Sequence, residues 1–178
     1  METTEKDTGS AQSKDEILNA VRERISATKI VDVNEQTVQL VFFTLLGGSY
    51  AIKGEDVKEI LYPGKITPVP GTPAYLLGLI NVRGDVESVV DFNLFLSLQK
   101  EPESANKRIL IAEKAGLRTG ILVGSVMDVE DVPKSTVGAS IGTIDDSKKE
   151  FIAGSVSYRD KNVTLLDLEK VFQKMEKL

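Results

Sequence analysis

Hydrophobic residues along this chain fall into many short runs separated by polar turns, a pattern typical of β-rich proteins. The first run, residues 38–46, reads VQLVFFTLL and is apolar on both faces of an extended chain. Such a strand is expected to be buried on two sides. Gly47 and Gly48 follow as a hairpin turn, so residues 49–52 are predicted to return as a second strand.

The same pattern predicts more strands along the rest of the chain. They are expected at residues 75–82, 86–90, 108–113, 117–123, 126–132, 151–158 and 162–166. Residues 57–61 fit either an extended piece or a short helical one. Prolines exclude a regular helix from residues 63–73, and the polar stretch 133–150 is expected to be a long loop. Many short strands with close turns indicate an all-β barrel or sandwich.

Helical patterns are few and short. A short helix is expected over residues 91–98. A closing helix starts near residue 168 and has one apolar face, formed by Leu168, Val171, Phe172, Met175 and Leu178.

The N-terminal region divides into two parts. Residues 1–12 are polar and charged, which predicts a disordered tail. Ser13 and Glu16 have the spacing of a capping box, and an apolar stripe follows, so we expect an amphipathic helix within residues 13–30. This helix either packs on its own domain or docks on a partner, and the sequence leaves both readings open.

Composition removes several classes of function. The 178 residues include 22 Lys and Arg against 27 Asp and Glu, a formal net charge of -5. A nucleic-acid binder needs a basic face, so we expect none of that activity. There is no His and no Cys, which excludes Ser-His-Asp and Cys-His relays and the usual zinc sites. We therefore predict no catalytic residue, no cofactor and no metal.

Targeting signals are also missing from the pattern. No apolar run has the length of a membrane span, and the first residues lack the apolar stretch of a secretory signal. The expectation is a cytoplasmic protein without direct membrane insertion.

One motif imitates an active site. Residues 138–142, GASIG, match the Gly-x-Ser-x-Gly elbow of hydrolases. That elbow requires a strand before it, a helix after it and a His to accept the serine proton, and this stretch is a polar loop in a chain without His. An enzyme that uses only Asp, Glu, Lys, Arg, Ser or Tyr is the competing hypothesis, but neither a phosphate-cradling Gly loop nor an obvious carboxylate pair supports it.

Three segments carry a more specific pattern. The first spans residues 40–60 and contains LVFFTL, YAI and VKEI, while the second, 70–84, reads PGTPAYLLGLINVRG and is closed by VVDF. The third, 120–129, reads GILVGSVMDV, with IAG and LLDL after it. Over about 135 residues, their order and spacing resemble the CheW-like coupling proteins of bacterial chemotaxis.

This resemblance implies a fold and a task. The fold is mainly β, with two small SH3-like β-barrel subdomains packed on a shared apolar core over residues 36–176 and short N- and C-terminal helices. The task is that of a non-catalytic adaptor in chemotaxis signal transduction. Its implied partners are the cytoplasmic tip of a chemoreceptor (a methyl-accepting chemotaxis protein) and the regulatory domain of a CheA-like histidine kinase. The protein would then associate with membrane receptor arrays through protein contacts.

The chain departs from the family pattern after its Arg-Gly pair. Ser88 stands where the family usually has Pro, and residues 85–87, Asp-Val-Glu, are more acidic than the usual apolar stretch. The alternative reading is therefore a divergent adaptor of a parallel motility or developmental pathway, which binds a receptor without standard kinase coupling.

The resemblance and the residue types together suggest a partner-binding set. Arg83 precedes the turn residue Gly84, and its planar guanidinium can hold a carboxylate, with Glu59 as the candidate partner. The competing reading of this pair is a structural or solvated ion pair.

Four further positions belong to the predicted set. Gly78 and Gly120 interrupt apolar strands, where glycine marks either a local bend or a close backbone approach near a docking groove. Val57 and Val129 are apolar beside charged neighbours, and either partner contact or core packing fits them.

Overall fold

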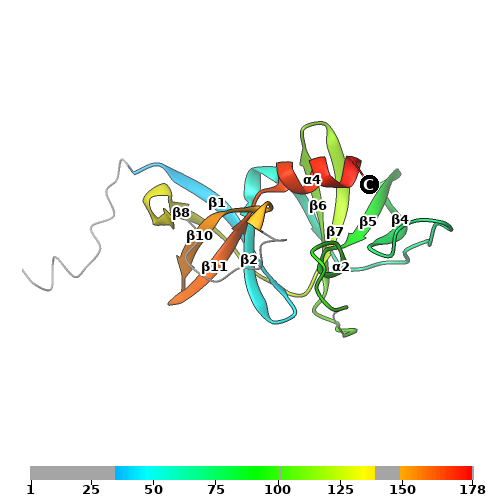
Figure 1. Cartoon of the computed structure of the whole chain (residues 1–178), viewed down its shortest axis with the longest axis horizontal. Helices are drawn as coiled ribbons and strands as arrows, with labels where there is room; N and C mark the ends of the chain where they lie inside the picture. The colour runs from blue at the N-terminus through cyan, green and yellow to red at the C-terminus, as the bar shows by residue number, and fades with distance from the viewer. Residues whose placement is uncertain (1–34, 101, 139–148, 178) are drawn as a thin grey trace, which may run out of the picture. The chain divides into compact units, whose positions relative to one another are not determined.

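The computed structural model describes residues 35–100, 102–138 and 149–177 of the chain. The chain divides into two units, residues 1–35 and 36–178, and every described strand and helix belongs to the second (Figure 1). The predicted tail at 1–12, the predicted helix at 13–30 and most of the GASIG motif lie outside the described residues.

The first sheet has six strands and forms the first barrel. Their order is β8-β1-β2-β11-β10-β9, antiparallel except for the parallel pair β11 and β2. The strands are β1 (Thr37–Leu45), β2 (Gly48–Lys53), β8 (Val126–Pro133), β9 (Val137–Gly138), β10 (Ile152–Tyr158) and β11 (Lys161–Leu166).

The second sheet has five strands and forms the second barrel. Their order is β3-β6-β7-β5-β4, so β3 and β4 are its two edges. The strands are β3 (Val57–Leu61), β4 (Leu76–Val82), β5 (Asp85–Asp91), β6 (Arg108–Lys114) and β7 (Leu117–Val123). The 3-10 helix η1 (Gly54–Asp56) carries the chain from β2 in the first barrel to β3 in the second.

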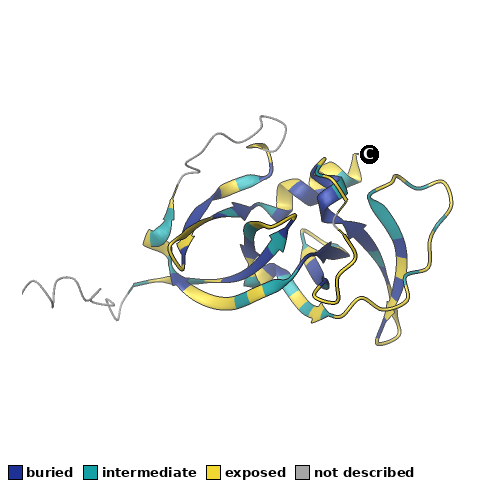
Figure 2. Cartoon of the chain, turned by 90° about the horizontal axis from the view of Figure 1, so that it is seen from below, coloured by how far each residue is buried: buried dark blue, intermediate teal, exposed yellow. Residues whose placement is uncertain are grey.

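The two barrels share an apolar core, as the resemblance implied. β1 supplies both of its faces to this packing: Leu40 and Phe42 point into the first barrel, while Val41 and Phe43 join the shared cluster. Because side chains alternate along a strand, an apolar run on both faces can serve two cores at once. The prediction of a strand buried on two sides is confirmed, because consecutive residues in the middle of β1 are buried. In Figure 2 the buried residues gather in the strands and the exposed ones in the connecting loops.

The second barrel has the same layered design. β6 alternates between Ile109 and Ile111, which fill its interior, and Leu110 and Ala112, which face the shared cluster. The fold class predicted from the sequence, mainly β with two small barrels on a shared apolar core, is therefore confirmed. All nine strands expected from the pattern are present, and their bounds differ by at most one residue.

Short helices complete the described part. In α2 (Phe92–Phe95) the Asp91 carboxylate accepts hydrogen bonds from two backbone N–H groups, and Asp167 does the same for α4 (Leu168–Glu176). Both are N-cap arrangements that satisfy otherwise unpaired donors. α4 buries Leu168, Val171 and Phe172 in the shared core, as its apolar spacing predicted. Leu178 lies outside the described residues.

The structure corrects the loop predicted after β8 and decides between the two readings of residues 57–61. The long loop predicted over residues 133–150 is wrong at its start, where a second 3-10 helix, η2 (Lys134–Thr136), and the two-residue strand β9 form. β9 pairs with β10, a long-range contact that leaves no periodic signal in so short a segment. For residues 57–61 the structure chooses the strand.

Candidate partner-binding surface

Glu59 and Arg83 meet in the structure. Arg83 Nη2 lies 2.5 Å from Glu59 Oε1, so the ion pair expected from the sequence is present. Glu59 belongs to β3 and Arg83 to the β4–β5 turn, and because β3 and β4 are the two edges of the sheet, the pair links one edge to the other. The Arg83 side chain is 81% exposed and that of Glu59 is 23% exposed, so the guanidinium remains accessible to a partner.

The turn that carries Arg83 is tightly built. Arg83 and Gly84 both have positive φ, 54° and 104°, the requirement of a two-residue type I′ hairpin turn. The Gly84 N–H donates to Asn81 Oδ1 at 3.0 Å, which closes the turn with a side chain of the same hairpin. Arg83 is thus held at a defined exposed position, a geometry that lowers the entropy lost on binding.

Gly78 lies inside the second barrel wall and not on its surface. It is buried, its φ is +139°, and a Cβ there would overlap the carbonyl oxygen of Thr67. Thr67 and Leu79 exchange two backbone hydrogen bonds of 2.8 and 2.9 Å, so the segment before β4 lies directly against that strand. Of the two readings of Gly78, the structure shows the close backbone approach.

Gly120 is buried on β7, and strand β5 lies between it and Gly78 on β4. Both glycines pair with Val89 of β5, one from each side. A Cβ on Gly120 would come within 2.9 Å of the Ile109 side chain and 3.1 Å of the Ser88 carbonyl oxygen. The two glycines are therefore close together, but in the interior of the barrel.

The two valines differ in burial. Val57, at the start of β3, is half-buried and packs against the shared core. Val129 is 44% exposed on the edge strand β8, directly opposite Val41 of β1. Since opposed residues of a ladder point to the same face, Val129 faces the same side as the shared core. Glu59, Arg83 and Gly84 thus form one local site, whereas Val129 lies on the other barrel.

Sequence reasoning missed an exposed aromatic site next to β3. Tyr62 is 74% exposed, and the Arg108 guanidinium lies 3.9 Å from its ring centroid. Arg108 also donates to two backbone carbonyls, at 2.7 and 3.2 Å, which fixes the stacked arrangement. Tyr and Arg are enriched in the energetically dominant contacts of interfaces. Tyr62 directly before Pro63-Gly64 was the available signal, but only the fold shows that it faces solvent.

Tyr62 also stands at the rim of a cavity of about 460 Å³ at one end of the second barrel. Ile66, Leu77 and Leu122 supply its apolar lining, and polar side chains surround them. A rigid aromatic residue beside a partly apolar hollow is suited to receive a side chain from another protein.

The acidic departure at residues 85–87 has two parts. Glu87 is buried, and Arg118 Nε lies 2.9 Å from its carboxylate, so this charge is compensated inside the barrel. Val86 is 66% exposed and Asp85 is exposed beside it. Only Asp85 and Val86 therefore change the surface that a partner meets.

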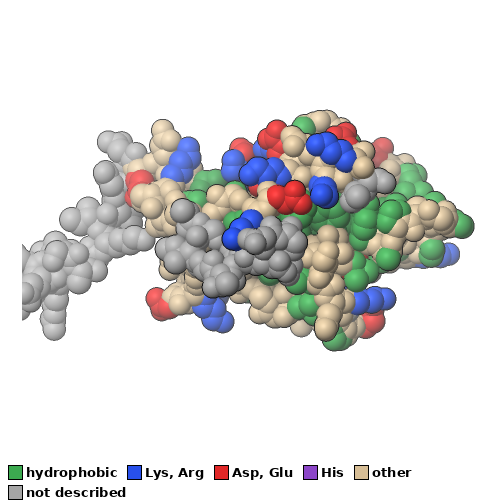
Figure 3. Space-filling model, viewed as in Figure 1, with side chains coloured by type: hydrophobic (Ala, Val, Ile, Leu, Met, Phe, Trp, Pro, Cys, Tyr) green, Lys and Arg blue, Asp and Glu red, His purple; other side chains and the backbone are tan. Residues whose placement is uncertain are grey.

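The described residues hold neither a metal cluster nor a membrane span. No group of three or more Asp or Glu side chains is arranged to hold a metal ion in this part of the chain. Among the described helices, none is long and apolar enough to cross a membrane. On the face shown in Figure 3, Lys and Arg side chains are interspersed with Asp and Glu and form no continuous basic area.

Two small barrels on a shared apolar core make this chain a double-barrel protein. A family model described as a CheW-like domain matches residues 39–176. Because this match covers most of the chain, the protein belongs to the CheW-like family.

Individual relatives agree with this assignment. The chemotaxis protein CheW of Rhizobium meliloti is 27% identical over 139 residues, which are 78% of this chain and 90% of that protein. Protein FrzA of Myxococcus xanthus is 26% identical over 125 residues, which are 68% of this chain and 77% of FrzA. The crystal structure of the scaffolding protein TtCheW from Thermoanaerobacter tengcongensis matches with a TM-score of 0.69 and 28% identity, covering 78% and 94% of the two chains.

Proposed function

We propose that this protein is a non-catalytic adaptor that couples a chemoreceptor to a CheA-type histidine kinase. Membership of the CheW-like family supports the class of function, and the solved relative is itself a scaffolding protein. The observation that carries the proposal is the Glu59–Arg83 pair, an oriented and accessible charged group at the rim of the second barrel. In this role the protein works in the cytoplasm at receptor arrays, held there through protein contacts.

The proposed binding surface has more than one chemical component. Arg83 offers charge-assisted hydrogen bonds, Tyr62 offers an aromatic face, and Val129 offers apolar contact on the other barrel. Because the exposed positions lie on both barrels, two partners can be bound through separate surfaces. The buried Gly78 and Gly120 act in this proposal by shaping the barrel and not by touching a partner.

A binding experiment with both partners tests this function. The full chain is immobilised and exposed to a receptor cytoplasmic tip, to a CheA-like regulatory domain, and to both together. Retention of each, and of both at once, is the expected result. The proposal fails for those partners if neither is retained at concentrations on the order of tens of micromolar.

The divergent-adaptor alternative rests on the exposed part of the acidic departure. Asp85 and Val86 lie at the start of β5, next to Arg83 and Gly84, and would face a partner that binds there. One relative, FrzA, carries a name that does not call it a chemotaxis protein. Receptor binding without any change in kinase activity on addition of this protein would favour this alternative over the coupling function.

A further inference from the structure

A buried carboxylate lies at the point where the chain enters the second barrel. Asp56 is the last residue of η1 and directly precedes β3, and its side chain is only 8% exposed. A buried charge is tolerated when it is paired and hydrogen-bonded. Its partner is therefore important for the conformation of this crossing.

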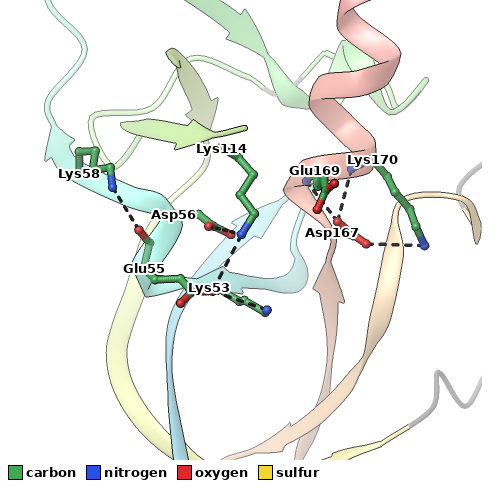
Figure 4. Close-up of polar contacts among 8 residues, drawn as sticks. All are labelled: Lys53, Glu55, Asp56, Lys58, Lys114, Asp167, Glu169 and Lys170. Carbon is green, nitrogen blue, oxygen red and sulfur yellow. Dashed lines mark hydrogen bonds and ion pairs between the residues drawn. The ribbon is translucent and has the colours of Figure 1, made fainter. Parts of the chain in front are cut away.

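Lys114 supplies that partner from the far end of β6. Its ammonium lies 2.8 Å from Asp56 Oδ1 and 3.9 Å from Glu55 Oε1. Figure 4 shows Lys114 reaching toward both side chains. The hydrogen bond to Asp56 raises the pKa of Lys114 above its ordinary value. The negative charge of Glu169, in the first turn of α4, raises this pKa as well. Among the described residues, Lys114 is the one cation in contact with Asp56.

The pair sits at the end of an irregular strand ladder. Val57 of β3 is opposite Ala112 of β6, and the register then shifts before Glu59, which is opposite Ile111. β3 is an edge strand, so backbone pairing on one side alone must set this register. Asp56 and Lys114 lie just beyond the Val57–Ala112 pair, where a side-chain bond can hold the ladder in place despite the irregularity.

We propose that Lys114 is a positioning residue for the partner-binding strand β3. Its bond to Asp56 fixes the register of β3 on β6, and this register sets the places of Val57 and Glu59 and brings Glu59 to Arg83. The effect on strand β3 stands on the geometry alone. The consequence for partner binding rests on the proposed function.

Hydrogen exchange of the β3 amides tests the first step. In Lys114→Met, the β3 amides that pair with β6 should exchange about 10-fold faster or more, relative to amides of β1 in the shared core. Lys114→Arg keeps the cation and should restore slow exchange. Lys170→Met is the matched control, because Lys170 pairs at 3.6 Å with Asp167, three residues away, and bridges no ladder.

A second variant covers the case in which Lys114→Met fails to fold. The double change Asp56→Asn with Lys114→Met removes the Asp56–Lys114 ion pair without leaving a buried charge. The β3 amides should again exchange faster than in the natural protein. Exchange rates of β3 equal to those of the natural protein in this folded double variant would overturn the proposal.

Partner affinity separates this proposal from the proposed function. If both are right, the double variant binds the receptor tip or the kinase domain about fivefold more weakly or worse, and Arg83→Ala added to it costs less affinity than in the natural protein. Faster exchange of the β3 amides with unchanged affinity for both partners would support the positioning role of Lys114 and would contradict the binding role given to β3.

Discussion

The interior of the second barrel and its β4–β5 turn contain two pairs of predicted residues with opposite physical roles. Gly78 and Gly120 are buried on either side of Val89, where side-chain atoms have no room. Arg83 and Gly84 lie on the surface, where the turn leaves open space around Gly84 and exposes the guanidinium. The resemblance placed all four in one functional set, but substitution should damage the fold in the first pair and binding in the second.

The largest effect is expected at Gly78. In Gly78→Ala, the new methyl group meets the Thr67 backbone, and alanine must adopt a φ of +139°. These two costs together should lower the free energy of unfolding by about 3–5 kcal/mol. Chemical denaturation measures this loss. A stable Gly78→Ala protein with weakened partner binding would instead mean that Gly78 contributes directly to the interface. The two pairs of residues would then not differ in role.

Gly120→Ala should cause a smaller loss by the same mechanism. Its backbone is not in the left-handed region, and the closest contact is the branch methyl Cγ2 of the Ile109 side chain at 2.9 Å. Since this side chain can yield partly, we expect a loss of about 1–3 kcal/mol in the free energy of unfolding. The double variant Gly120→Ala with Ile109→Leu tests the cause, because leucine has no branch methyl at Cβ and should recover part of the loss.

Arg83→Ala should separate binding from stability. An exposed ion pair contributes less than about 1 kcal/mol to stability, so the melting temperature should change little. Partner affinity should fall by about 1–3 kcal/mol when a charge-assisted contact is removed from an interface. Glu59→Ala should show a similar defect, and the double variant should be less than additive because the two side chains act as one unit.

The measurement is a comparison of melting temperature with receptor-tip and kinase affinity for these variants. A large loss of melting temperature with unchanged affinity of the folded fraction would show that the Glu59–Arg83 pair serves only to stabilise the barrel. Arg83 would then belong with the glycines and not with the binding surface.

The smallest effect is expected at the corresponding turn of the first barrel. Between β10 and β11, Arg159 and Asp160 both have positive φ, 48° and 60°, without a glycine at either position. Asp160→Gly should relieve this strain and raise the free energy of unfolding by about 0.5–1 kcal/mol. Asp160→Ala is the control and should show no such gain in thermal denaturation. Equal stabilities of the two variants would show that the turn is not strained.

The difference between the two pairs also shows what a residue pattern can reveal. Gly78 and Gly120 were recognisable as unusual because they interrupt apolar strands. The reason for each lies in a segment that the pattern does not connect to it: Thr67 for one, Ser88 and Ile109 for the other. The GASIG motif carried a pattern as well, but its serine had no His in the chain to act with.

Local order was determined by the sequence itself, and the double-barrel class followed from the resemblance of its motifs to the CheW-like family. The run of apolar residues on both faces of β1 predicted a strand buried on two sides, and the apolar face of α4 predicted the closing helix, because such patterns act within a few residues. The Lys114–Asp56 pair, 58 residues apart, and the exposed place of Tyr62 were decided only by tertiary structure. Contacts of this kind depend on strand order and register, which bring distant side chains together without any spacing rule along the chain.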